Sequence, residues 1–154
     1  RGLSKELLPH LKVYHFEDKI GFTSPKWFGY PTVNMGAATP VKSWLIKANL
    51  VYDLDLQTDP NGDGVNLLMA YALNLNPNQN LTGSLPQPVI SDHGMHLNFY
   101  AGTPAVSYSV ESSADLITWS TERVTLSGLD ANQSVTATVD RSSPSRFMRL
   151  VVTH

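Results

Sequence analysis

The sequence predicts a mainly β protein with a small helical part, because its hydrophobic pattern changes along the chain. Apolar residues recur at helical spacing between residues 41 and 75, but occupy every second position in several segments beyond residue 89. A polar stretch containing Pro and Gly, residues 81–88, separates the two patterns. With 42% hydrophobic residues the chain can bury a core. We therefore expect an irregular segment 1–40, a helical part 41–80, a linker 81–88 and a β part 89–154.

The N-terminal 40 residues give the weakest pattern. A short helix is expected from Ser4 to just before Pro9, since proline cannot continue a helix. Residues 12–18 alternate in hydrophobicity and predict a strand. Residues 21–40 hold three prolines and three glycines, which predicts loops. This segment reads either as an irregular start or as the end of an upstream domain.

Three aromatic residues gather in the loop-rich segment: Trp27, Phe28 and Tyr30. Aromatic faces on a rigid loop are typical of sugar-binding modules, because the C–H bonds of a pyranose ring stack on them. The same rings equally suit a packing role over neighbouring apolar helices. Both interpretations stay open.

Two helices are expected on either side of an acidic loop. Residues 41–50 place Trp44, Leu45 and Ala48 on one apolar stripe. Residues 65–75 are apolar on almost every side, so the second helix should be buried.

Beyond the linker, period-two alternation predicts several short strands. Short apolar segments at regular spacing are typical of a small antiparallel β-sandwich of the fibronectin type III or immunoglobulin-like kind. The helical part would pack on this sandwich. The expected strands cover residues 95–99, 106–110, 116–119, 123–126, 135–139 and 148–152.

The acidic loop has the spacing of a calcium site. Asp59, Asn61 and Asp63 stand at alternate positions, and a glycine follows where such loops turn sharply. The carbonyl of Val65 falls at the seventh position. The twelfth position, which normally supplies a bidentate Glu, is Ala70, so one ligand is missing. Restoring it with Ala70→Glu is expected to tighten binding.

Nearby acidic residues are candidates for the missing ligand. Asp53 and Asp55 precede the loop by a few residues, and eight acids but no Lys or Arg lie between Lys47 and Arg123. Unopposed carboxylates attract a cation, which favours Ca²⁺. The alternative is a polar turn, because Asp, Asn, Pro and Gly are ordinary turn residues.

The segment "DPNGDGVNLLMAYALNLNP" resembles a calcium-loop segment of dockerin and thrombospondin type 3 kind that recurs in large secreted bacterial proteins. "YSVESSADLITWS" and "SRFMRLVV" resemble the strand-rich module that closes many of those proteins. The resemblance covers about residues 41–154 and departs from the pattern at Ala70. It implies a secreted bacterial protein, often a polysaccharide-degrading enzyme or an adhesin, whose catalytic part lies upstream.

No catalytic motif marks the chain as an enzyme by itself. His93 and His96 should point to opposite faces of a strand, which disfavours a metal pair. A glycosidase needs two carboxylates that meet in space, and Glu17 and Asp18 are candidates for such a pair. The absence of cysteine excludes thiolate chemistry and Cys-ligated zinc.

The expected function is therefore that of a non-catalytic accessory module. It would stabilise or space an upstream domain, or attach it to polysaccharide or a cell surface, with a structural Ca²⁺. The alternatives are the C-terminal fragment of a polysaccharide-active hydrolase, lyase or sulfatase, and a self-assembling extracellular subunit that adds residues 12–18 to a neighbour's sheet. The net charge of −2 gives no reason to expect nucleic acid, and no apolar run is long enough to span a membrane. The chain begins with Arg1 instead of Met, so we expect an excised or processed piece.

Overall fold

A computed structural model describes residue 8 and residues 10–154, and divides the chain into two compact units, Arg1–Asp53 and Leu54–His154. We describe each unit by itself. The short helix expected from Ser4 lies outside the described residues. The architecture is mainly β, with several sheets and two helices, as the sequence predicts.

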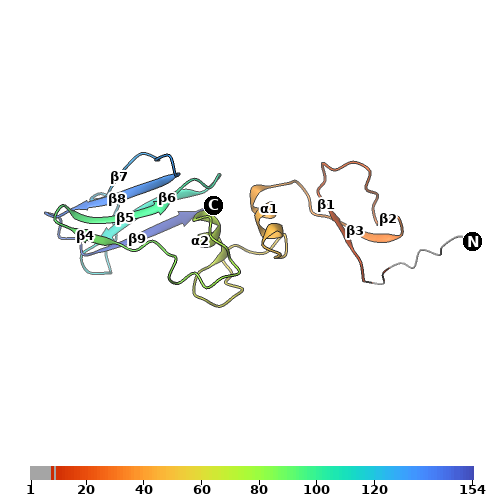
Figure 1. Ribbon diagram of the computed structural model, residues 1–154, viewed down its shortest axis with the longest axis horizontal. Coiled ribbons are helices and arrows are strands. Elements are labelled where there is room, and N and C mark those ends of the chain that lie inside the picture. The colour runs from red at the N-terminus through yellow and green to blue at the C-terminus, as the bar shows by residue number, and fades with distance from the viewer. Residues whose placement is uncertain (1–7, 9) are drawn as a thin grey trace, which may run out of the picture. The chain divides into compact units, whose positions relative to one another are not determined.

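The N-terminal unit holds a three-stranded sheet in the order β1-β3-β2 (Figure 1). The strand expected within residues 12–18 is present as the shorter β1, which pairs in parallel with β3. The segment expected to be rich in loops contains β2 and β3, an antiparallel hairpin. The strands are β1 (Val13–His15), β2 (Lys26–Trp27) and β3 (Tyr30–Asn34).

Helix α1 (Pro40–Lys47) is shorter than the expected 41–50 because its ends are capped. Thr39 accepts a hydrogen bond from the backbone N–H of Lys42, and Pro40 occupies the first turn, where it costs no hydrogen bond. At the other end Asn49 adopts a left-handed conformation, and Leu50 N–H donates to the carbonyl of Leu45 over 2.9 Å. Asparagine tolerates this conformation, so the helix stops there.

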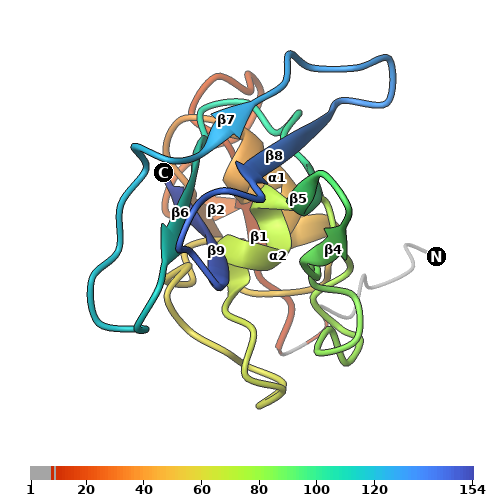
Figure 2. The same ribbon diagram turned by 90° about the vertical axis from the view of Figure 1, so that its left-hand side faces the viewer.

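The C-terminal unit contains two separate sheets. One has four strands in the order β4-β5-β8-β7, and the other pairs β6 with β9; all pairings are antiparallel. Figure 2 shows the two sheets as distinct layers. The strands are β4 (Val89–Ser91), β5 (Gly94–Tyr100), β6 (Ser107–Ser113), β7 (Thr125–Leu126), β8 (Ser134–Asp140) and β9 (Phe147–Thr153).

The core of this unit lies between the sheets. Its cluster takes Leu97 and Phe99 from β5, Val139 from β8, and Val110 and Met148 from β6 and β9. These residues occupy alternate positions, as the period-two pattern predicts.

The prediction of a strand over residues 116–119 is wrong. Asp115 instead organises a turn, in which its carboxylate accepts hydrogen bonds from the backbone N–H groups of Ile117 and Thr118 at 2.9 and 2.8 Å. Leu116 has a positive φ of 64°. A side chain that satisfies local N–H groups competes with strand pairing, and here it prevails.

Helix α2 (Leu67–Ala72) belongs to the core of the same unit. Leu73 joins the cluster between the sheets, and Leu68 and Ala72 pack against Val152 of β9. The hydroxyl of Tyr108 donates to the carbonyl of Ala72 over 2.7 Å. The expected burial of this helix is confirmed.

The division of the chain differs from the expected boundary at residues 81–88. Leu81 is buried, and Leu85 packs against the core. The polar composition of that segment conceals these two anchors. The division falls instead between Asp53 and Leu54. Of the described helices, neither is long and apolar enough to cross a membrane.

Candidate functional site

The loop expected to bind calcium is wound around the carboxylate of Asp59. This carboxylate accepts hydrogen bonds from the backbone N–H groups of Gly62 at 2.9 Å and Gly64 at 2.8 Å. Both glycines have positive φ, 69° and 85°, which glycine adopts without strain. The D-P-N-G-D-G pattern therefore encodes a closed, tight turn.

Asp63 joins the loop to a distant part of the chain. One carboxylate oxygen accepts from Val65 N–H at 2.8 Å, and the other from Leu81 N–H at 2.6 Å. The hydrogen bond from Leu81 is the main reason that the pKa of Asp63 lies below its usual value, with desolvation opposing it. Asp63 is thus a carboxylate at neutral pH.

Asn61 completes this connection. Its side-chain N–H₂ lies within hydrogen-bond distance of the carbonyl oxygens of Pro77 at 3.1 Å and Gln79 at 2.8 Å, and of the Asp63 carboxylate at 3.2 Å. We call these hydrogen bonds, in which Asn61 donates to Pro77 and Gln79 and Asp63 accepts from Leu81, the Asn61 clamp. The clamp holds two loops, one on each side of α2, against each other.

The oxygen atoms around this clamp suit a hard cation. Asp59 and Asp63 supply carboxylates, Asn61 an amide oxygen, and Pro77 and Gln79 carbonyls close to that amide. Ca²⁺ takes six to eight oxygen ligands of these kinds. Within the described part of the chain, no Lys, Arg or His forms an ion pair with Asp59 or Asp63. The kinds of residue present therefore fit Ca²⁺, and the carbonyls of Pro77 and Gln79 accept hydrogen bonds from the side-chain N–H₂ of Asn61.

Asp53 and Asp55, the two acids expected to replace the missing ligand, have roles outside the loop around Asp59. The carboxylate of Asp55 accepts from Gln57 N–H at 2.9 Å, which forms a separate turn. Asp53 is the last residue of the N-terminal unit. Among the described residues, no three acidic or histidine side chains gather as a metal-holding group. The ligand roles of Asp53, Asp55, Asp59, Asn61, Asp63 and Val65 stay predictions.

Ala70 is buried in the helix that follows the loop. It lies in α2 with 1% of its surface exposed, among the buried residues of that helix. A Glu side chain at this position would bury a carboxylate in the core, which is costly. The expectation that Ala70→Glu tightens binding therefore gives way to an expectation of destabilisation.

The three aromatic residues of the N-terminal unit lie on one hairpin. Trp27 and Tyr30 are cross-strand partners, and Phe28 with Gly29 forms the two-residue turn between them. Both turn residues have positive φ, 48° and 87°, as a type I′ turn requires. This conformation is uncommon for a bulky residue such as Phe28, whose side chain is 72% exposed.

Trp27 has a packing role as well. Its ring lies 5.1 Å from that of Phe22 and 4.6 Å from that of Phe28, and Phe22 stacks on His15 at 5.0 Å. Trp27 is half-buried in this row, whereas Phe28 is exposed. The row is thus held by packing among its own rings, its tip is accessible, and sugar binding stays a prediction.

Among the remaining candidates, His96 and Asp18 have structural partners. His96 places its two ring nitrogens 2.9 Å from the Ser91 hydroxyl and 3.2 Å from the Thr138 hydroxyl. His93 lies in the turn before β5. Asp18 pairs with the neighbouring Lys19 at 3.2 Å, and Glu17 is exposed beside it.

Sequence reasoning missed the part that residues 76–81 play. A signal was present, because Asn76, Asn78 and Asn80 alternate as the loop acids do, and a Pro follows the first residue in both segments. Two of these asparagines form their own turns, accepting from backbone N–H groups two residues on. The chain matches none of the protein-family models, curated proteins or solved structures with which it was compared.

Proposed function

We propose that the chain is a non-catalytic accessory module of a secreted bacterial protein, stabilised by Ca²⁺ at the two loops joined by the Asn61 clamp. The C-terminal unit would be a β-sandwich of the fibronectin type III or immunoglobulin-like kind. Its two facing antiparallel sheets with a shared core support that assignment. The resemblance of residues 59–77 to secreted calcium-loop segments supports the location.

The observation that carries the calcium proposal is the clamp itself. The carboxylate of Asp63 shares the side-chain N–H₂ of Asn61 with the carbonyls of Pro77 and Gln79, and neither Asp63 nor Asp59 in the same loop has a cationic partner among the described residues. Calcium there would neutralise the carboxylates and fasten both loops. Since Leu73, between the two loops, and Leu81, at the end of the second loop, are buried, order in the loops is coupled to the core.

Calcium should therefore stabilise the C-terminal unit. A ligand that binds only the native state adds RT ln(1 + [Ca²⁺]/Kd), about 2.7 kcal/mol at a hundredfold excess over Kd. For a unit of this size the melting temperature should rise by roughly 5–10 °C. The measurement is thermal unfolding by circular dichroism in chelator and in millimolar Ca²⁺, with Mg²⁺ as a poor substitute because it prefers a smaller octahedral site.

Matched variants locate the effect. Asp59→Asn should remove most of the calcium response, whereas Asp130→Asn, in a loop before β8, should leave it unchanged. Identical melting in chelator and in calcium would show that the loops form a turn that needs no metal.

Attachment to a glycan is the second part of the proposal. The exposed Phe28 at the hairpin tip, held in a strained turn, supports a stacking surface with Trp27 and Tyr30. Phe28→Asn keeps the positive φ that the turn requires and removes the ring. It should reduce retention on an insoluble polysaccharide without loss of structure; unchanged retention counts against the hairpin.

A further role is favoured by the N-terminal unit. Among its described apolar side chains only Met35 and Leu45 are buried, while Ile20 and Val51 are mostly exposed. We therefore keep two alternatives: this unit completes an upstream domain, such as that of a polysaccharide-active hydrolase, lyase or sulfatase, or β1 adds to a neighbour's sheet. Light scattering distinguishes them, since only the second gives an oligomer of the 154-residue chain.

A further inference from the structure

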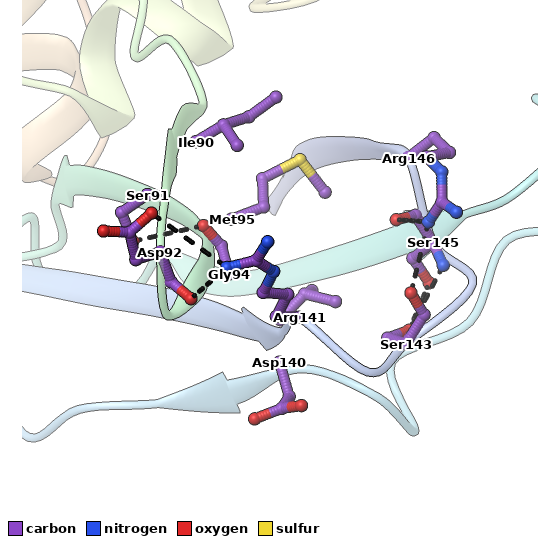
Figure 3. A pocket seen from close by; sticks show the side chains of 11 residues that line it. Ile90, Ser91, Asp92, Gly94, Met95, Asp140, Arg141, Ser143, Ser145 and Arg146 are labelled. Atoms are coloured by element: carbon purple, nitrogen blue, oxygen red, sulfur yellow. Dashed lines mark hydrogen bonds and ion pairs between the residues drawn. The ribbon is translucent and has the colours of Figure 1, made fainter.

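A cavity of about 690 Å³ lies at one end of the C-terminal unit, away from the calcium loops. It is an open hollow bordered by the turn between β4 and β5 and by the connection from β8 to β9 (Figure 3). Gly94 brings these segments together: a Cβ atom there would lie 2.1 Å from the carbonyl oxygen of Val139. A cavity of this size is in the range of small-ligand sites.

Arg146 offers a preformed fork for a carboxylate. One terminal nitrogen of its guanidinium donates to the carbonyl oxygens of Ser143 at 3.2 Å and Ser145 at 3.1 Å. A guanidinium has five N–H donors, so the edge formed by Nε and the other terminal nitrogen remains. The described residues give that edge no partner and Arg146 no ion pair. This is the edge that binds a carboxylate through two parallel hydrogen bonds.

The segment that carries Arg146 is held in place. Its backbone N–H donates to the carbonyl of Ser113 over 2.8 Å. The hydroxyl of Ser145 lies 3.1 Å from those of both Ser143 and Ser112, and the latter two residues are buried. The guanidinium is thus positioned before any ligand arrives, which lowers the entropy cost of binding.

The other polar groups around the cavity have mixed charge. Arg141 reaches the carboxylate of Asp92 only at 4.0 Å, and both side chains are largely exposed, so this pair is weak. Asp140 accepts from the N–H and hydroxyl of Ser142 at 2.8 and 2.6 Å. Carboxylates on the rim repel a dense polyanion but accept hydrogen bonds from hydroxyl groups. The unit as a whole holds nine acids and four arginines, which also disfavours a polyanion.

Apolar side chains supply the remaining surface. Ile90 and Met95, which are cross-strand partners, line the cavity, and Figure 3 shows their side chains near each other. The required ligand therefore has one carboxylate, several hydroxyl groups and an apolar ring face. We infer that the cavity binds a uronic acid residue of an acidic oligosaccharide, with its carboxylate on Arg146 and its hydroxyls on Asp92 and Asp140. The choice of a sugar rests on the attachment role proposed above, whereas the carboxylate rests on this cavity alone.

Trigalacturonate is the probe, titrated into the ¹⁵N-labelled chain in calcium-containing buffer. Saturable shifts at millimolar concentration are expected for the amides of residues 91–94 and 141–146. The trimethyl ester has the same rings without charge. Its affinity should be at least about tenfold lower, because a charge-assisted hydrogen-bonded pair is lost. The absence of shifts with trigalacturonate, or equal binding of the ester, overturns the inference.

Variants test the assigned arginine. Arg146→Gln should weaken binding at least about tenfold, and Arg146→Lys should restore only part of it, since Lys cannot bind side-on. Arg123→Gln, which lies outside the cavity lining, is the matched control and should bind normally. Unchanged affinity in Arg146→Gln overturns the inference; if that variant unfolds, the shifts in the unmodified chain decide.

Two further outcomes separate the source of the carboxylate and the role of the module. If an acetylated dipeptide binds more strongly than trigalacturonate, the assignment of a sugar ligand is overturned in favour of a peptide carboxylate. Melting in calcium and chelator is measured on the same samples. If uronate binds but calcium does not raise the melting temperature, only the calcium proposal is refuted. If calcium raises the melting temperature but uronate does not bind, only the uronate proposal is refuted.

Discussion

The N-terminal unit arranges three strands and one helix around few buried apolar side chains, of which the described part contains Met35 and Leu45. The C-terminal unit arranges two sheets and one helix around a continuous core that draws on every long strand. Both units have well-formed local structure, including helices with similar caps. Local signals therefore form elements in both units, but only the second has the buried area that usually makes a fold independent.

This difference also separates the kinds of function that each unit suits. A unit with exposed Tyr14, Ile20 and Val51 is suited to contact with another surface. A unit with its own core is suited to carrying loops and a cavity at fixed positions. The proposed calcium loops and uronate site both lie on the second kind.

The largest expected effect comes from cutting the chain. Residues 54–154 should unfold cooperatively on their own, because α2, Leu81 and Leu85 remain with the sheets. Residues 89–154, the β part expected from the sequence, should lose cooperative unfolding, because α2 and its contacts are removed. Calorimetry of the two fragments tests this. A sharp transition for the shorter fragment would restore the boundary at residues 81–88.

A pair of core substitutions sharpens the same contrast. Leu97→Ala removes a side chain that is 2% exposed between the sheets, and should cost about 2–5 kcal/mol. Leu45→Ala removes an equally buried side chain from the N-terminal unit. Leu45→Ala should leave the main unfolding transition nearly unchanged, because that transition reports the core of the C-terminal unit, to which Leu45 does not belong. Urea denaturation followed by near-ultraviolet circular dichroism measures both, and equal losses would contradict the comparison.

A smaller loss is expected at Gly94. Its φ of 131° and the 2.1 Å approach of a Cβ to the Val139 carbonyl exclude a side chain. Gly94→Ala should cost about 1–3 kcal/mol from backbone strain alone. Gly128→Ala, where a Cβ meets nothing within 4 Å, is the control in the same unit. The two melting temperatures should differ by several degrees, and equal values would mean that the turn moves freely.

The smallest expected effect concerns acid. The folded-state pKa of Asp63 is lowered, chiefly by the hydrogen bond from Leu81, so its contribution is present above the unfolded-state pKa and is lost as pH falls through the folded value. In the absence of calcium, the melting temperature should therefore decrease when the pH is lowered below about 4. Asp63→Asn should reduce that drop, whereas Asp92→Asn, with a fully exposed side chain, should not. An identical acid profile in Asp63→Asn would remove the clamp as a source of stability.

The sequence predicted the alternating strands well because alternation is a property of each strand and its buried face. Met95, Leu97 and Phe99 identify β5 without knowledge of any neighbour. The turn at Asp115 was missed because residues 116–119 are mostly apolar, as in a strand. Only the hydrogen bonds to the Asp115 carboxylate make this segment a turn.

The candidate sites were predicted less completely, for a related reason. The spacing of Asp59, Asn61 and Asp63 describes one loop, whereas the clamp needs the carbonyls of a segment about 17 residues away. Backbone carbonyls have no residue signature, so a sequence cannot show them as ligands. The fork of Arg146 was missed because Ser143 and Ser145 direct it through their main-chain oxygens.

The Asn61 clamp also determines how α2 can open. The N–H groups of Gly64 and Leu81 lie in the two loops that flank this helix, and they donate to two carboxylates of the first loop, Asp59 and Asp63 respectively. Neither amide belongs to a regular element, so each would ordinarily exchange its hydrogen within the fast regime of loops. Because the clamp closes the loops on each other, both amides become part of one cooperative opening unit with α2. Their exchange rates should be slow and nearly equal, although 17 residues separate them.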